Sequence, residues 1–214
     1  MRERPILFNG AMVRAILSGA KTQTRRAMKV QPVRNGRFWE VYGAGWSDGM
    51  SSVPAVHGHS LATNCAFGQP GDRLWVRETW MPGYYHEADH EDGPRVSLIY
   101  AADNAESAIP APSYELAEQW EREFCEDGDE PPPWRPSIHM PRWACRLVLE
   151  ITDVRVERLQ AISDVDALAE GVDQTNTSIA GYARQRFQKL WTDTGGDWDA
   201  NPWVWVIGFK QGTP

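Results

Sequence analysis

The sequence predicts an α+β fold, a compact mixed barrel-like domain with a few helices around it. Segments with alternating apolar residues outnumber segments with a helical apolar stripe. Long loops separate them, without the regular strand–helix alternation of a parallel sheet or a glycine-rich dinucleotide fingerprint. The chain has 214 residues, of which 42% are hydrophobic and 24% charged, so it can form one large domain with its own core.

The N-terminal segment predicts a short strand followed by a helix. Residues 6–8 form the strand, and Asn9 is a suitable N-cap for a helix over residues 10–17, where apolar residues recur at helical spacing. Gly19 suits the position just after the helix. The polar stretch 20–26, Ala-Lys-Thr-Gln-Thr-Arg-Arg, therefore leaves the end of this helix.

The next regular pattern is a strand that follows the Pro70-Gly71 turn. Residues 27–68 are rich in Gly and Ser and predict irregular structure. Residues 73–80 alternate, which places Glu78 on a face that begins apolar. Because an unpaired buried charge is very costly, we expect Glu78 to be partly buried beside a cation or a hydrogen-bond donor.

The pattern predicts a single domain over residues 1–214 with two insertions. A strand is expected over residues 96–101. Residues 103–133 are acidic, contain a short helical pattern at 114–124, and predict an insertion on the surface. The other insertion is expected at about residues 35–65.

The C-terminal third predicts a long strand, two helices and a last strand. Residues 145–156 alternate, but the apolar phase slips near Thr152-Asp153, as a β-bulge would cause. Ser163 and Asp166 have the spacing of a helix capping box. The remaining expected elements are a short helix that stops at Gly171, a longer helix over 179–191 and a strand over 203–209.

Charge is divided unevenly along the chain, whose net charge is −7. No acidic residue lies between Arg4 and Trp39, whereas residues 87–130 are strongly acidic. A basic region on an acidic protein can bind a polyanion locally while the overall charge limits indiscriminate binding. A solvated basic face, or two regions that face each other, would give the same pattern.

The cysteine content and the apolar segments indicate an intracellular setting. The three cysteines are scattered, which favours reduced thiols in the cytoplasm over a disulfide framework. We identify no signal peptide and no apolar run of about 20 residues that would cross a membrane. The expected localisation is cytoplasmic, which means the host cytoplasm for a phage-encoded chain, and no membrane partner is expected.

The stretch around Lys21 resembles a known family motif. Gly19, Lys21 and Arg26 fit the Gly-x-Lys-x-x-x-x-Arg pattern of the ASCH domain, a relative of the PUA RNA-binding fold. Further blocks in the same order resemble the ASCH proteins of bacteriophages and prophages and cover most of the chain apart from residues 35–65 and 103–133. The resemblance implies a small mixed β-barrel flanked by helices. It also implies a ligand that is a nucleoside or single-stranded nucleic acid, with RNA favoured over DNA.

The resemblance also implies candidate catalytic residues. The chain is similar at Gly-x-Lys-Thr-x-Thr to bacterial amidohydrolases that remove the acetyl group from N4-acetylcytidine. This similarity assigns catalytic roles to Lys21 and Thr24 and, through a looser match, to Glu170. Glu78 is the reserve for the acidic residue. The alternative is an RNA- or DNA-binding module without this activity, or a ribonuclease.

Other residues are candidates for ligand binding. Arg25 and Arg26 can hold phosphate because the guanidinium fork matches its oxygens. Loop tryptophans can stack a base, whereas tryptophans in strand patterns favour the core. The stacking candidates are Trp39, Trp46 and Trp134, and further ligand contacts are assigned to Thr22, Arg77 and Trp75. No metal and no cofactor are expected.

The catalytic assignment places conditions on residues 21–24. Thr24 becomes a nucleophile only when a base removes its proton, and Lys21 can do so only when it is neutral. Burial and neighbouring cations lower the pKa of a lysine. In a flat strand, residues 21 and 24 would point to opposite faces, so the assignment requires a turn or an irregular segment. We therefore expect both side chains in one cleft, with Glu170 or Glu78 within reach of Lys21.

Overall fold

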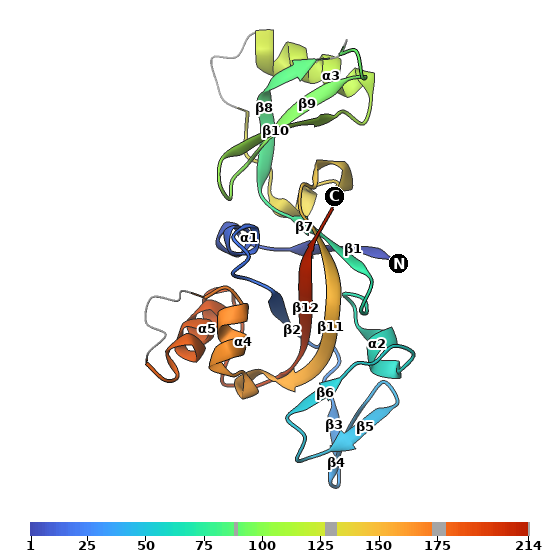
Figure 1. Cartoon of the computed structure of the whole chain (residues 1–214), viewed down its shortest axis with the longest axis vertical. Coiled ribbons are helices and arrows are strands. Elements are labelled where there is room, and N and C mark those ends of the chain that lie inside the picture. The colour runs from blue at the N-terminus through green and yellow to red at the C-terminus, as the bar shows by residue number, and fades with distance from the viewer. Residues whose placement is uncertain (88–89, 127–131, 173–178, 214) are drawn as a thin grey trace. The chain divides into compact units, whose positions relative to one another are not determined.

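The computed structural model describes residues 1–87, 90–126, 132–172 and 179–213, which form a mixed α+β fold (Figure 1). The chain divides into two compact units, whereas the sequence predicted one domain with insertions. Unit 1 comprises residues 1–4, 15–74 and 148–213, and unit 2 comprises residues 5–14 and 75–147. Three elements continue from one unit into the other, namely β1 (Glu3–Leu7), α1 (Gly10–Leu17) and β7 (Arg73–Arg77).

A long antiparallel strand pair forms the centre of unit 1. Strand β11 (Val148–Arg158) pairs with β12 (Trp203–Gly212), and β12 pairs with β2 (Gln23–Ala27). The register of β11 shifts between Ile151 and Asp153, so the predicted bulge is confirmed. Strand β6 (Ser52–Pro54) pairs with the other side of β11. The described strands follow an open order, β1-β7-β11-β12-β2, so they do not close the barrel that the resemblance implied.

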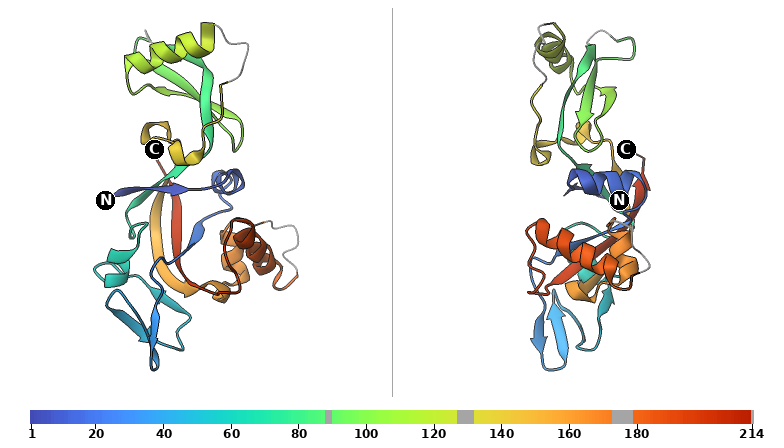
Figure 2. Two further views of the ribbon diagram at one scale, coloured as in Figure 1. Left: turned by 180° about the vertical axis from the view of Figure 1, so that it is seen from behind. Right: turned by 90° about the vertical axis from the view of Figure 1, so that its left-hand side faces the viewer.

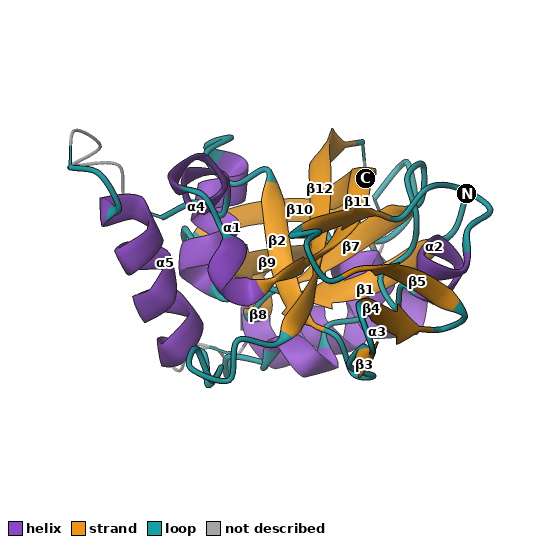
Figure 3. Cartoon of the chain, turned by 90° about the horizontal axis from the view of Figure 1, so that it is seen from below, coloured by secondary structure: helices purple, strands orange, loops and turns teal. Residues whose placement is uncertain are grey.

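Two helices cover one side of this sheet and position the candidate site. Helix α4 (Asp164–Ala169) and helix α5 (Tyr182–Asp193) lie beside β2 and β12 (Figure 3). Their core includes Ala167 and Phe187, which pack with Val204 and Val206 of β12. The Ser163 hydroxyl accepts a hydrogen bond from the Asp166 amide at 3.0 Å, which confirms the predicted cap of α4.

The prediction of irregular structure over residues 27–68 is wrong. Strands β3 (Val33–Asn35), β4 (Phe38–Val41) and β5 (Ala44–Ser47) form a small antiparallel sheet, and α2 (Ser60–Asn64) follows. These strands have only three or four residues each, which is too short to give a clear alternating pattern. Tyr42 and Gly43 form the β4–β5 turn with positive φ angles of 53° and 77°.

Unit 2 contains a second three-stranded sheet that is covered by a helix. Strands β8 (Trp80–Glu87), β9 (Arg95–Tyr100) and β10 (Ala105–Pro110) pair in the order β10-β9-β8, and α3 (Tyr114–Glu121) packs on them (Figure 2). Trp120 of α3 is buried against Trp80, so the expected insertion 103–133 supplies a strand and a helix to a core. The short helical turns of the chain are Arg122–Glu126, Ser137–His139, Arg142–Ala144 and Leu159–Ala161.

Glu78 lies in unit 2 in a buried ion-pair network. Its carboxylate is 1% exposed and accepts hydrogen bonds from Nε and Nη2 of Arg146, both at 2.9 Å. The same guanidinium binds both carboxylate oxygens of Asp103, at 3.0 and 2.9 Å, and lies 4.1 Å from the ring centroid of Tyr100. Burial raises the pKa of Glu78, although Arg146 opposes this shift. The expectation of a buried carboxylate beside a cation is confirmed.

The described part of the chain contains no helix that is both long enough and apolar enough to span a bilayer.

Cys65 and Cys145 are free and buried, and burial raises the pKa of both thiols above the ordinary value. Both thiols are therefore held in the less reactive protonated form.

Candidate functional site

The segment that carries Lys21 is fixed between two helices before it enters β2. Gly19 has a φ of 77° and ends α1, as predicted. The Lys21 amide then donates to the Ala15 carbonyl at 2.9 Å, and the Thr22 amide donates to the Ala169 carbonyl at 2.8 Å. Lys21 forms an isolated antiparallel bridge with Glu170, just after the last residue of α4. Lys21 therefore lies outside the regular strand, which begins at residue 23.

Lys21 and Glu170 form a buried ion pair although they are 149 positions apart. Nζ of Lys21 donates to Oε2 of Glu170 at 2.8 Å and to the backbone carbonyl of Glu170 at 2.9 Å. The Lys21 side chain is 0% exposed and that of Glu170 is 3% exposed. The expectation that Glu170 lies within reach of Lys21 is therefore confirmed.

Burial lowers the pKa of Lys21 below its ordinary value, because the charged ammonium has lost its water. The negative charge and the hydrogen bond of Glu170 oppose this shift. The positive charges of Arg26 and Arg25 add to it. The neutral amine is therefore more favoured at Lys21 than it is for an ordinary lysine on the protein surface.

Arg25 connects the pair to a second set of carboxylates. Its Nη1 binds Oε1 of Glu170 at 3.1 Å, and its Nη2 binds Oε2 of Glu157 at 2.9 Å. Asp166 lies at 3.5 Å from the same Nη2. The Arg25 side chain is 0% exposed and those of Glu170 and Glu157 are 3% and 8% exposed, so these two contacts are shielded from water and their charge interactions are strong.

Arg155 completes the network from strand β11. Its Nε binds Oε1 of Glu157 at 2.7 Å, and its Nη2 binds Oδ1 of Asp166 at 3.0 Å. Burial alone would raise the pKa of Asp166, but the hydrogen bond of Ser163 and the charge of Arg25 lower it below the ordinary value. Asp166 is therefore held as a carboxylate that accepts a hydrogen bond from the Ser163 hydroxyl and pairs with arginine.

Alternate residues of the Lys21 segment face helix α4. Gln23 donates to the Asp166 carbonyl on α4 at 2.9 Å. Lys21 and Arg25 both bind Glu170, the residue that follows α4, so the side chains of residues 21, 23 and 25 point to the same side. Thr24 is opposite Ile207 in the β2–β12 register and is 1% exposed. Its hydroxyl accepts a hydrogen bond from Nη1 of Arg26 at 3.1 Å. By the same alternation, Thr24 points away from α4 whereas Lys21 points toward it, so the expectation that both side chains project into one cleft is not supported by their arrangement here.

Gly171 maintains the close approach of α4 to the Lys21 segment. It has a φ of 81°, and an added Cβ would lie 2.8 Å from Cβ of both Ala15 and Lys21. We expect Gly171→Ala to destabilise the fold by roughly 2–3 kcal/mol, from backbone strain and overpacking together. Gly195 is the matched control because it has a φ of 87° and open space around it.

Urea denaturation of both variants measures this difference. Gly195→Ala should cost only about 1 kcal/mol, because it adds backbone strain without a clash. Equal losses of stability in the two variants would contradict the role assigned to the packing at Gly171.

Several other residues were predicted for the site. Arg77 and Trp75 belong to unit 2, where the Arg77 guanidinium lies 5.5 Å from the Trp75 ring. Thr22 is exposed, and Trp46 is buried with its ring centroid 5.2 Å from that of Trp203. Trp46 therefore does not present its face for base stacking.

The two remaining stacking candidates, Trp39 and Trp134, differ in their surroundings. The guanidinium of Arg158 lies 4.6 Å from the ring of Trp39 and 4.7 Å from that of Trp203. The Trp39 ring therefore already has a cation as a stacking partner in unit 1. Trp134 in unit 2 is 46% exposed.

Sequence reasoning missed Glu157 and Arg155 and assigned Asp166 only to the helix cap. Glu157 and Arg155 alternate with Val154 and Val156 in β11, a pattern that usually marks the solvent side of a strand. The available signal was the spacing of Arg155 and Glu157, which lie two residues apart and so share one face of β11.

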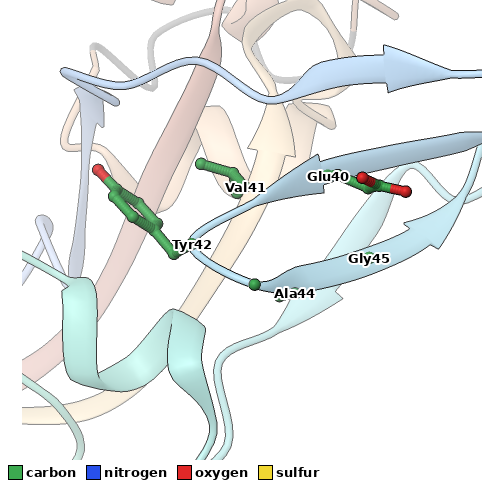
Figure 4. A pocket seen from close by; sticks show the side chains of 6 residues that line it. Glu40, Val41, Tyr42, Ala44 and Gly45 are labelled. Carbon is green, nitrogen blue, oxygen red and sulfur yellow. The ribbon is translucent and has the colours of Figure 1, made fainter.

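A shallow hollow lies elsewhere in unit 1, at the β4–β5 hairpin. Its volume is about 420 Å³, and residues 40–45 line it. Figure 4 shows the ring of Tyr42 at the turn and the carboxylate of Glu40 on β4. The hollow has one carboxylate and one phenol but no cation or nucleophile, so it supplies less chemistry than the Lys21 network.

No family model, curated protein or solved structure matches the chain.

Proposed function

We propose that unit 1 is an ASCH-like domain that binds a nucleoside and hydrolyses the acyl amide on N4 of cytosine. The observation that carries this proposal is the buried Lys21–Glu170 pair. The resemblance named these two residues from opposite ends of the chain, and their side chains lie 2.8 Å apart. An ordinary structural ion pair would also be buried and paired. Turnover of an N4-acylated substrate distinguishes a catalytic pair from a structural one.

The proposed reaction requires residues 21–24 to rearrange around the ligand, because Thr24 points away from α4 and Lys21 points toward it. Oγ1 of Thr24 then attacks the acyl carbon while neutral Lys21 accepts the hydroxyl proton. The bond between the acyl carbon and N4 breaks, and Lys21 returns the proton to the leaving amine. Water then hydrolyses the ester on Thr24 and releases the carboxylic acid. Arg26, whose Nη1 is 3.1 Å from Oγ1 of Thr24, supplies positive charge beside the developing oxyanion.

The burial of the network supports a small ligand over a polynucleotide strand. Lys21, Thr24 and Glu170 are all 3% exposed or less. A ligand can reach them only when covering side chains move, and a nucleoside requires a smaller opening than a strand does. The proposed substrate is therefore an N4-acylated cytidine, cytosine or deoxycytidine.

Incubation of the protein with N4-acetylcytidine tests the proposal, with cytidine and acetate separated by chromatography. We expect stoichiometric release of both products over many turnovers. The amino-sugar analogue 2′-acetamido-2′-deoxycytidine is the control substrate, because it has the same acyl group on a different nitrogen. The proposal would be contradicted if the protein released cytidine from none of the N4-acylated cytidines.

A nucleic-acid-binding module is the second candidate because cations and an aromatic ring are exposed together near β3 and β4. Lys29, Arg34, Arg37 and Phe38 are exposed, and Phe38 retains 54% of its accessible surface. Arg34 already pairs with Asp48 at 2.5 Å, which reduces its availability for phosphate. This surface could bind a single strand without any role for the Lys21 network.

Salt dependence measures the contribution of this surface. With about three phosphate contacts, affinity for single-stranded RNA should fall roughly twenty-fold when the salt concentration rises fourfold. Arg37→Gln should reduce the slope of log affinity against log salt by about 0.7. Lys189→Gln is the control, because Lys189 is an exposed lysine that pairs with Asp193 on α5. Binding that does not depend on salt, or no binding at low salt, would exclude this candidate.

A further inference from the structure

The two oxygens of the Glu170 carboxylate are divided between two cations. Oε2 binds Nζ of Lys21 at 2.8 Å and Oε1 binds Nη1 of Arg25 at 3.1 Å. A carboxylate that faced Lys21 alone would hold the lysine in its charged form, which cannot act as a base. The second cation shares the negative charge of Glu170 and fixes the plane of its carboxylate.

Arg25 is itself held in place on several sides. Glu157 of β11 binds its Nη2 at 2.9 Å, and Asp166 of α4 lies at 3.5 Å. The ring centroid of Phe187 on α5 lies 5.8 Å from its Cζ. Arg155 binds the second carboxylate oxygen of both Glu157 and Asp166. These two carboxylates are therefore held in place themselves, and they hold Arg25 in turn. A guanidinium held in this way keeps a fixed direction toward Glu170.

The charged groups around Lys21 include both carboxylates and guanidiniums. The carboxylates of Glu157, Asp166 and Glu170 face the guanidiniums of Arg25 and Arg155, and Arg155 also binds the exposed carboxylate of Asp153 at 3.1 Å. Arg26 adds a third positive charge that acts on both Lys21 and Glu170. These groups come from β2, β11 and α4, and α5 adds the uncharged Phe187 ring. The positive charges of the three arginines therefore offset much of the carboxylate charge that would otherwise keep the Lys21 amine protonated.

We propose that Arg25 is a positioning residue, which holds Glu170 so that the carboxylate orients Lys21 but leaves its amine able to lose a proton. This inference rests on the proposed function of Lys21 as a base. It assigns to Arg25 a role distinct from the phosphate binding expected from the sequence. Only the neutral amine accepts a proton, so the hydrolysis rate should rise with pH as Lys21 is deprotonated. The midpoint of this rise should lie below the ordinary lysine value of about 10.4.

The titration of Lys21 can be measured without any substrate. Lys21, Lys29, Lys189 and Lys210 are the only lysines, so protein with ¹³C-labelled lysine gives a simple spectrum of Cε signals. Comparison with Lys21→Met assigns the Lys21 signal, whose chemical shift is then followed against pH. We expect Arg25→Gln to move the Lys21 midpoint upward by about one unit, which leaves roughly tenfold less neutral amine at a given pH.

Two further variants separate positioning from charge and from general damage. Arg25→Lys keeps the positive charge but lacks the guanidinium fork. The midpoint of the Lys21 titration should therefore lie close to the wild-type value, while kcat stays low. Arg184→Gln makes the same substitution as Arg25→Gln at an exposed arginine on α5 and should change neither quantity. The pH–rate profile of Arg25→Gln should shift in the same direction as the Lys21 signal.

The outcomes distinguish this inference from the proposed function. A Lys21 midpoint that is unchanged or lower in Arg25→Gln overturns the positioning role, even when the wild-type protein hydrolyses the amide. An upward shift supports the positioning of Glu170, even when no substrate is turned over, and in that case only the assigned reaction fails. An upward shift of the midpoint together with an unshifted pH–rate profile overturns the role of Lys21 as the base.

Discussion

Thr24→Ala is expected to abolish hydrolysis of N4-acetylcytidine while ligand binding remains largely intact. The nucleophile acts only in the chemical step, so its removal should lower kcat by about ten-thousand-fold or more. The structural cost should be small, about 1 kcal/mol, because one hydrogen bond to Arg26 is lost. Arg26 keeps a hydrogen bond from Nη1 to the Arg25 carbonyl at 3.2 Å. Turnover and equilibrium binding of the nucleoside together measure this split.

Two variants make the Thr24 experiment specific. Thr192→Ala removes an exposed threonine hydroxyl on α5 and should leave turnover unchanged. Thr24→Ser keeps a hydroxyl and should retain a substantial part of the activity. Full activity in Thr24→Ala would show that Thr24 is not the nucleophile and would leave activation of a water by Lys21 as the alternative.

Arg146→Met is expected to cause the largest loss of stability, about 3–5 kcal/mol, because it leaves the Glu78 carboxylate buried without its cation. Glu78 is 1% exposed and receives two hydrogen bonds at 2.9 Å from this guanidinium. Its raised pKa should rise further in the variant. Protonation would then recover part of the stability, so the loss should be smaller at low pH than at neutral pH.

Hydrogen exchange of the β8 and β9 amides measures this loss within unit 2. Lys210→Met is the control, because the Lys210–Glu150 pair is exposed and should contribute less than about 1 kcal/mol. Adding Glu78→Gln to Arg146→Met removes the buried charge and should recover part of the stability. Equal protection in the wild-type protein and Arg146→Met would contradict the importance of this pair.

Much of the fold could be predicted from local patterns in the sequence. The α1 helix, its end at Gly19, the cap at Ser163 and the bulge near Asp153 each depend on residues close in sequence. The β3–β4–β5 sheet was missed because its strands are short and its stability depends on packing of Trp46 against Trp203. The division into two units depends on long-range contacts that no local pattern encodes.

The candidate site was predictable only in part. The Lys21–Glu170 pair was anticipated because a family resemblance linked two distant positions. The roles of Glu157 and Arg155 were not, because alternation in an isolated strand marks a polar face as solvent-facing. Here that face is covered by α4, which places Asp166 against Arg155 at 3.0 Å. Coverage by a distant helix is a tertiary property, so the pattern within β11 could not reveal it.

Release of cytidine from N4-acetylcytidine by the wild-type protein and by Lys21→Met tests the central claim most directly. Arg25 still pairs with Glu170 at 3.1 Å when Lys21 is replaced, so the variant should remain folded. We expect many turnovers by the wild-type protein and none above background by Lys21→Met. No release by the wild-type protein, or equal release by both proteins, would contradict it.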